Sequence, residues 1–239
     1  MRKSLILFLL ICVASVAMAQ EKVGGFIHVS AGLSTPQGDF GSSDASNARA
    51  GFAKGGPSLG VLLGHKIAGP FGMFGQFTNS FCLIDREGLA NSLSGTGNYS
   101  WSSDMAAWRL TGFSFGPHLS FNLKRSAFDI RTSVGAMTYF SPELNLSGSS
   151  QTGGSDASLK QLSTRSSSWT LGVGLTYKYE VKWGFVLLAN AEYLMGNPNF
   201  VDVQTELYLD GVGLISEQKS TYQQGFRMLN LELGCGWVF

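Results

Sequence analysis

Hydrophobic and polar residues alternate along much of this chain. The clearest stretch is the end of the sequence, where six apolar residues fall at every second position: Leu229, Leu231, Leu233, Cys235, Trp237 and Phe239. Residues 128 to 136 and 169 to 179 follow the same period of two. Successive side chains of a β-strand point to opposite faces of a sheet, so this period predicts strands with one apolar face.

Similar segments occur throughout the chain after residue 22. Each is at least as long as the roughly 9 to 11 residues that a tilted strand needs to cross a bilayer. After Gln20, no stretch is apolar for long enough to cross one as a helix. The eight predicted strands cover residues 23 to 34, 55 to 67, 71 to 83, 106 to 123, 127 to 140, 168 to 181, 183 to 195 and 223 to 239.

The connections between these segments alternate between long and short. Residues 35 to 54, 84 to 105, 141 to 167 and 196 to 222 form long loops rich in Ser, Gly and Asn, whereas the connections near Gly69, Arg125 and Lys182 are minimal turns. Short turns on one side and long loops on the other are typical of outer-membrane barrels. Closure of the sheet is required in lipid, because an unpaired backbone group has no water to bind there. The sequence therefore predicts an all-β fold, an eight-stranded antiparallel up-and-down transmembrane β-barrel with both ends on the periplasmic side.

The first residues have the pattern of a secretory signal. Arg2 and Lys3 precede a short apolar core, and Ala17-Met18-Ala19 supplies a small-x-small cleavage site. We expect residues 1–19 to be a signal peptide cleaved before Gln20, and residues 20–239 to form the barrel domain. An uncleaved membrane anchor is the alternative.

Composition supports a membrane location and excludes one class of partner. Charged residues make up only 14% of the chain, against an average of about 25%. Loss of Arg2 and Lys3 with the signal reduces the 17 basic residues to 15, against 16 acidic ones. The expected mature chain therefore has no basic surplus for nucleic acid, and we expect no nucleic-acid partner.

The chain resembles the small eight-stranded outer-membrane barrels of the OmpA/OmpX type in three features. These are the alternating strands, the alternation of long and short connections and the final Gly236-Trp237-Val238-Phe239. More narrowly, the chain is similar to the outer membrane beta-barrel, or porin-family, proteins of Bacteroidetes-like bacteria. The resemblance implies a place in the bacterial outer membrane, surrounded by its lipid. It also implies that Trp237 and Phe239 belong to the signal that the barrel-assembly machinery reads.

Aromatic residues near the strand ends suit the two girdles of such a barrel, since their rings prefer the headgroup region. Ordinary core packing in a soluble periplasmic or secreted barrel is the alternative. The residues expected in the girdles are Tyr177, Tyr179, Trp183 and Trp237 at the periplasmic rim, with Tyr139, Phe140, Trp169 and Tyr193 at the outer rim.

The interior of an eight-stranded barrel is just wide enough to be filled by side chains. Glu232 is expected near mid-height, with His28 at a similar level on the neighbouring strand and Glu192 nearer the outside. The residues predicted to point inward in the periplasmic half are Lys66, His118, Lys124, Asp129, Arg131, Lys178 and Glu180. We predict a structural network of paired charges, since buried charges need partners. A proton or ion path is the alternative.

Nothing in the sequence predicts catalysis or a cofactor. Of the three histidines, only His65 is expected to face outward, and no serine accompanies it as a nucleophile. The two G-x-S-x-G matches, residues 56 to 60 and 112 to 116, lie inside predicted strands and not at the strand-to-helix turn that a nucleophile elbow requires. Cys82 and Cys235 form no C-x-x-C pair and have no histidine at metal-binding spacing. We therefore expect no catalytic residues, no metal and no cofactor.

The fourth long loop contains a second alternating pattern. Val201, Val203, Thr205, Leu207 and Leu209 lead into Asp210-Gly211, which predicts a hairpin that continues beyond the membrane. Its free edge would accept a partner strand, or the loop would serve as a rim or cap. The sequence thus favours a non-enzymatic structural or surface-interaction protein whose extracellular loops contact the surroundings or a partner protein. A narrow channel or small-solute or proton transporter is the first alternative, and a lipid-acting enzyme is the second.

Overall fold

The computed structural model describes residues 24–239 except 45, 48, 95–98 and 105. The predicted signal peptide lies outside the described residues. Eight long strands form the main sheet: β1 (Gly25–Pro36), β3 (Gly56–Ala68), β4 (Phe71–Ile84), β6 (Ala107–Leu123), β7 (Ser126–Phe140), β10 (Arg165–Lys182), β11 (Phe185–Gly196) and β14 (Phe226–Val238). Their ends differ from the predicted ones by at most three residues.

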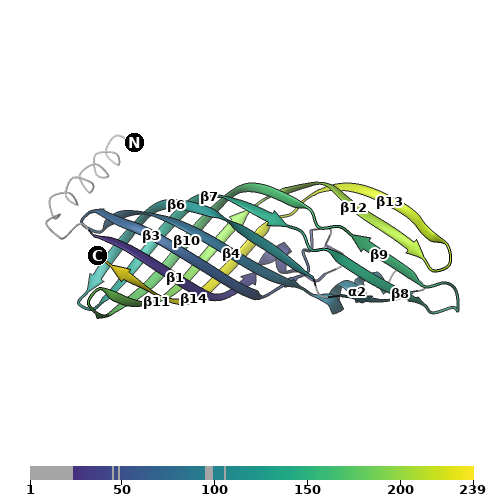
Figure 1. Ribbon diagram of the computed structural model, residues 1–239, viewed down its shortest axis with the longest axis horizontal. Coiled ribbons are helices and arrows are strands. Elements are labelled where there is room, and N and C mark those ends of the chain that lie inside the picture. Colours follow the sequence, from purple (N-terminus) through teal and green to yellow (C-terminus); the bar gives the residue numbers. More distant parts are fainter. Residues whose placement is uncertain (1–23, 45, 48, 95–98, 105) are drawn as a thin grey trace.

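The eight strands form a closed antiparallel barrel (Figure 1). Each of the long strands pairs with its sequence neighbour in the barrel, and β1 pairs with β14 to close the ring. The predicted fold class is therefore confirmed. Within the described part of the chain, no helix is long and apolar enough to cross a membrane.

Three two-residue turns join strands at the end of the barrel where β1 begins and β14 ends. In the turn between β10 and β11, Trp183 has φ 52° and Gly184 has φ 80°. Positive φ at both central positions is typical of the type I′ hairpin turn. A Cβ at Gly184 would also collide with the carbonyl oxygen of Val238, so this turn requires glycine.

The outside of the barrel is covered by apolar side chains. Such a continuous apolar surface is unfavourable in water and is what a lipid-facing barrel requires. Exposed members of this belt include Ile27, Val29, Leu33, Leu59, Val61, Leu63, Phe113, Phe115, Ile130, Leu171, Val173, Leu175, Leu187, Leu231 and Leu233.

Of the eight residues expected in the two girdles, Tyr139 is the one that the structure buries. Trp169 and Trp183 are highly exposed on the outer surface, and Tyr177, Tyr179 and Trp237 are also exposed. Tyr139 is instead buried inside the barrel, where its hydroxyl lies 2.7 Å from that of Thr170. The assignment of Tyr139 to the outer girdle was wrong because Tyr139 shares its face of β7 with inward-facing Arg131.

Beyond the barrel, three of the long loops form a second sheet. Its strands are β5 (Tyr99–Ser103), β8 (Leu144–Ser150), β9 (Ala157–Gln161), β12 (Asn199–Leu209) and β13 (Gly213–Gln223), in the order β13-β12-β9-β8-β5. The strands β12 and β13 form the hairpin predicted from the fourth loop. The sheet lengthens the molecule at the end opposite the two-residue turns, on the right of Figure 1.

The first two long loops add three short elements near the same end. They are the 3-10 helix η1 (Gly38–Gly41), the strand β2 (Ala53–Lys54) and the helix α2 (Arg86–Ser94). The strand β2 pairs with the end of β4, and η1 lies against β14. These elements bring loop residues over the mouth of the barrel.

Candidate functional site

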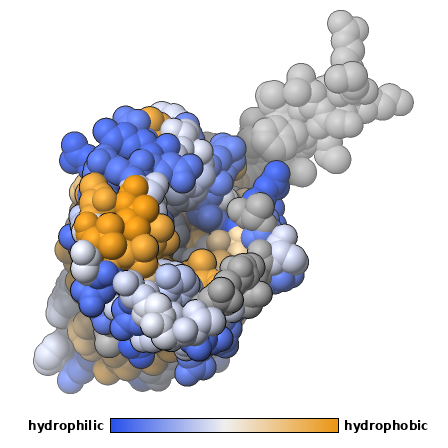
Figure 2. Space-filling model, turned by 90° about the vertical axis from the view of Figure 1, so that its right-hand side faces the viewer, coloured by the Kyte–Doolittle hydropathy of each residue, from blue (hydrophilic) through white to orange (hydrophobic). Residues whose placement is uncertain are grey.

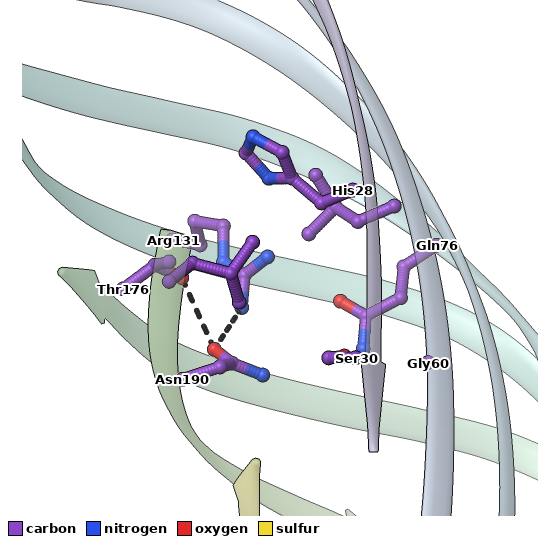
Figure 3. Close-up of a pocket in the computed structure, with 9 residues that line it drawn as sticks. His28, Ser30, Gly60, Gln76, Arg131, Thr176 and Asn190 are labelled. Atoms are coloured by element: carbon purple, nitrogen blue, oxygen red, sulfur yellow. Dashed lines mark hydrogen bonds between the residues drawn. The ribbon is translucent and has the colours of Figure 1, made fainter. Parts of the chain in front are cut away.

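The barrel interior is the region where buried polar groups gather. Because β-strand side chains alternate, every strand contributes one inward face, and the polar residues of these faces meet near mid-height. Figure 3 labels six of them, contributed by β1, β4, β7, β10 and β11, together with Gly60 of β3.

The Glu232 carboxylate on β14 is held by three side-chain donors. The hydroxyl of Ser30 donates to Oε2 over 2.7 Å, and the hydroxyl of Ser58 donates to Oε1 over 3.0 Å. The amide Nδ2 of Asn190 donates to Oε2 over 3.2 Å. These donors replace the water that a buried carboxylate loses.

A second set of contacts links Arg131 to the same cluster. Its Nη2 donates to Asn190 Oδ1 over 2.6 Å, and that oxygen also accepts from the hydroxyl of Thr176 over 3.1 Å (Figure 3). The guanidinium also lies 5.2 Å from the centroid of the Phe74 ring. Asn190 therefore connects Arg131 to Glu232 through its two amide atoms.

Glu192 lies nearer the extracellular end and is only 2% exposed. The amide of Gln76 donates to Glu192 Oε2 over 2.7 Å and also to the hydroxyl of Thr78 over 3.0 Å. Glu192 was predicted to be nearest the outside, and the register places it opposite Asn230 on β14, two positions above Glu232.

The periplasmic half of the interior contains an ion pair and a cluster of rings. Lys178 Nζ lies 2.6 Å from Asp129 Oδ2 and 4.8 Å from the centroid of Phe26. The ring of Phe26 stacks on His28 at 4.6 Å and meets His118 edge-on at 5.4 Å. His118 lies directly over Gly72, where any Cβ would collide with the imidazole.

Several expected network members lie elsewhere or make different contacts. Glu180 is exposed at the periplasmic rim, where its carboxylate accepts a hydrogen bond from the backbone N–H of Gly184. Lys66 is half-buried at the same rim. His28 pairs with Gly236, whereas Gly32 pairs with Glu232. His28 was expected at a similar level to Glu232 on the neighbouring strand, and in the register it lies four positions from the partner of Glu232.

The interior was predicted to contain a network of paired charges, and most of its charged groups are bound by neutral groups instead. Among the interior residues that the structure describes, Lys178 and Asp129 form the one direct ion pair. Arg131, Glu192 and Glu232 are bound instead by amide and hydroxyl groups. Neutral partners of this kind hold these charged groups in place without requiring opposite charges in contact.

A small cavity lies at the centre of this network. It has a volume of about 10 Å³ and is lined by residues that include His28, Gln76, Arg131 and Asn190 (Figure 3). That volume is close to the roughly 10 to 15 Å³ needed for one water molecule. Within the described structure, His28 Nε2, Gln76 Oε1 and Arg131 Nε have no hydrogen-bond partner. A single water molecule is thus the ligand that fits this cavity.

Above the polar network, apolar side chains fill the barrel. Phe226 and Met228 of β14 pack with Trp108 and Leu110 of β6, and the rings of Phe226 and Trp108 are 5.3 Å apart. The long loops add further members of this apolar plug, whose buried residues are Phe40, Ala53, Cys82, Ile84, Trp108, Leu110, Met137, Tyr139, Leu194, Phe200, Val203, Phe226 and Met228.

The plug was not predicted from the sequence. Phe40 and Phe200 lie outside the predicted strands, yet both are fully buried. The indole N–H of Trp108 donates to the carbonyl oxygen of Gly51 over 3.0 Å, which ties the first loop to the barrel wall. Large aromatic residues in otherwise polar loops were the available signal, because such side chains rarely remain exposed without a partner.

At the other end, the last residues close the ring. The N–H of Phe239 donates to the carbonyl of Gly25 over 2.9 Å, and the N–H of Gly25 donates to Phe239 O over 2.8 Å. The Trp237 and Phe239 side chains are exposed. The proposed assembly residues are thus at the surface, at the seam between β1 and β14.

The closed eight-stranded barrel with an apolar outer belt defines this protein as a small outer-membrane β-barrel, located in the bacterial outer membrane. No protein-family model and no curated protein matches the chain.

Similar solved structures include a major outer membrane protein from Thermus thermophilus, with 11% identity and a TM-score of 0.49. Ail, the attachment invasion locus protein of Yersinia pestis, has 14% identity and a TM-score of 0.46. Neisserial surface protein A has 15% identity and a TM-score of 0.43. In each case the match covers 92% of this chain and 100% of the other. At these values, the likeness gives no information about function.

Proposed function

We propose that this protein is a non-enzymatic surface-interaction protein whose extracellular sheet binds a partner protein. The observation that carries the proposal is the five-stranded sheet built from three long loops, which projects beyond the barrel (Figure 1). The strands β12 and β13 have 11 residues each. A loop that only connects two barrel strands does not need strands of this length.

The outermost hairpin has two features that suit a binding surface. First, Val212 is 72% exposed, and Leu214 and Ile215 are exposed beside it. Figure 2, which views this end of the molecule, shows an apolar patch surrounded by polar side chains. Apolar side chains that face water in this way favour burial against a partner.

Second, β13 is an edge strand. It pairs with β12 on one side, and among the described residues nothing pairs with its other side. A free edge offers backbone N–H and C=O groups to an extended partner segment. Glu217 and Lys219 lie on this strand, and charged residues on an edge oppose uncontrolled pairing with other sheets.

The non-enzymatic part of the proposal is supported by the surroundings of His65. His65 faces outward on β3, and its register partners are Met73 and Gly25, neither of which is a nucleophile. Incubation of the purified protein with outer-membrane lipids should leave their mass spectra unchanged. A changed acyl pattern would instead support the lipid-acting enzyme.

A cell-adhesion experiment tests the surface role. Cells that express the protein would be compared with cells that carry the triple variant Val212→Ser, Leu214→Ser, Ile215→Ser, on epithelial monolayers and on sister cells. We expect adhesion by the triple variant to fall about tenfold, the effect of losing one or two well-buried anchor residues. Surface amounts would be matched by antibody labelling.

The matched control is the double variant Ser216→Ala, Gln218→Ala, which changes polar residues of the same strand. It should adhere like the unmodified protein. Equal adhesion by the triple variant, or no gain in adhesion over cells that lack the protein, would contradict the proposal.

A further inference from the structure

The periplasmic end of the barrel contains a large open cavity below the Lys178–Asp129 ion pair. Its volume is about 900 Å³, and it is lined by the inward faces and turns at the periplasmic ends of the strands. We call it the vestibule. Pockets for small molecules commonly have volumes of about 300 to 1,000 Å³, so the vestibule has the size of a ligand site.

The lining of the vestibule is predominantly cationic. Lys66, Lys124, Arg125 and Lys178 line it, and Glu180 is the one acidic side chain in the lining. Lys178 is paired with Asp129, but Lys66, Lys124 and Arg125 have no ion-pair partner among the described residues. These three unpaired cations favour an anionic ligand in the vestibule.

Buried polar groups at its inner end lack partners as well. Ser120 lines the vestibule and is only 3% exposed, and its hydroxyl has no hydrogen-bond partner within the described structure. Ser120 is the register partner of Asp129, whose Oδ1 also lacks one. Buried polar groups are normally satisfied by protein, water or ligand, so this end of the vestibule is suited to a polar group.

The opposite part of the lining is apolar. Phe26, Val186, Val238 and Phe239 contribute to it. A cavity with cations on one side and apolar residues on the other suits a ligand that combines an anionic group with a carbon skeleton. A phosphomonoester has a charge of about −1.5 to −2 at pH 7 and three acceptor oxygens, which suit the unpaired Lys66, Lys124 and Arg125.

We propose that the vestibule is a binding site for a phosphate ester, open to the periplasm and separate from the extracellular sheet. Lys66 on β3 and Arg125 in the turn between β6 and β7 supply the charge. The planar guanidinium of Arg125 donates two parallel hydrogen bonds to the phosphate. Ser120 lies at the inner end, below the phosphate. The apolar plug at the other end of the barrel keeps this site accessible from one side only.

The test uses the full-length protein in nanodiscs of phosphatidylcholine, with glycerol 3-phosphate as the soluble probe. Isothermal titration should give saturable binding, and the double variant Lys66→Gln, Arg125→Gln should bind at least about tenfold more weakly. Ser120→Ala should weaken binding about tenfold, as expected for one hydrogen bond to a charged group. A parallel arm adds phosphatidylglycerol to the nanodisc and follows the backbone amide signals of residues 120 to 126. Shifts in that arm alone would identify a lipid headgroup as the source of the phosphate.

The matched control is Lys182→Gln. Lys182 is near the same rim but is outside the vestibule lining, and its ammonium lies 4.2 Å from the centroid of Trp183. The control should bind glycerol 3-phosphate like the unmodified protein. Equal weakening by Lys182→Gln would reveal nonspecific attraction and overturn the proposal. Absence of binding to both phosphate sources would also overturn it, provided that heat-modifiability gels show folded barrels.

Discussion

Glu232 shows how a charged side chain is accommodated inside this barrel without an opposite charge in contact. Its two oxygens accept hydrogen bonds from Ser30, Ser58 and Asn190, which come from three different strands. The nearby Gly60 leaves room for this arrangement, since a Cβ there would lie 2.8 Å from Ser30 Oγ and 3.1 Å from Glu232 Oε2. The polar network therefore depends on small residues as well as on donors.

Glu232→Ala is expected to reduce the free energy of unfolding by about 2 kcal/mol, because three donors would be left without their acceptor in a buried place. Glu232→Gln should cost less, since the amide keeps the size and one acceptor oxygen. Urea unfolding of the barrel in lipid vesicles measures both. An alanine variant as stable as the unmodified protein would show that water replaces the carboxylate without cost.

At the scale of elements, α2 is connected to the barrel rim through Asp85. Its Oδ1 lies 2.7 Å from Lys54 Nζ and accepts the N–H of Gly88 over 3.2 Å, as an N-terminal cap of the helix does. The hydroxyl of Ser43 donates to Oδ2 over 2.7 Å. The contact with Lys54, supported by these hydrogen bonds, lowers the pKa of Asp85 below its ordinary value.

The depressed pKa gives this contact a defined pH dependence. A carboxyl group whose pKa is lowered by folding stabilises the folded state above its ordinary pKa, and this contribution is lost as the pH falls through the lowered value. We expect the Gly88 amide to exchange faster at pH 3 than at pH 6 after correction for intrinsic rates. The effect should be below about 1 kcal/mol, because Lys54 is largely exposed. Asp85→Asn should exchange equally at both pH values. If it kept the pH response, another group would be responsible.

The seam between β1 and β14 is the second element with a testable role. Phe239 exchanges two backbone hydrogen bonds with Gly25, and its ring packs over that glycine. If Trp237 and Phe239 serve as the assembly signal, deletion of Phe239 should lower the amount of protein in the outer membrane severalfold. The refolded protein should lose at most about 1 to 2 kcal/mol, the value of two hydrogen bonds. Unchanged membrane amounts would contradict the assembly role.

At the scale of the whole molecule, the apolar plug separates the vestibule from the extracellular side. The plug contains residues from the upper interior of the barrel strands and from the first and fourth long loops. An eight-stranded barrel has little interior space to begin with. The arrangement therefore argues against solute passage and favours a closed barrel that presents different surfaces at its two ends.

Planar-bilayer recordings should consequently show no conductance above background for the unmodified protein. The double variant Trp108→Ala, Phe226→Ala removes two rings of the plug and should produce measurable openings, at a cost of about 3 kcal/mol or more per ring in stability. A sustained conductance in the unmodified protein would support the channel alternative.

The sequence by itself determined the number of barrel strands, their ends within a few residues and the face of most of their side chains. These features follow from a local rule, the period of two, combined with the long and short connections. The same rule placed Arg131, Asp129, Glu192 and Glu232 inside. Tyr139 was misplaced when its aromatic character was given more weight than its position in that period.

The tertiary structure decided which inward side chains meet. The offset between neighbouring strands of a tilted barrel sets these contacts, and periodicity does not reveal it. In the register between β1 and β14, Glu232 therefore pairs with Gly32 and not with His28. The extracellular sheet and the plug depend on contacts between segments far apart in the chain, as between Phe40 in the first long loop and Phe226 on β14. Such contacts are set by how the loops fold over the closed barrel.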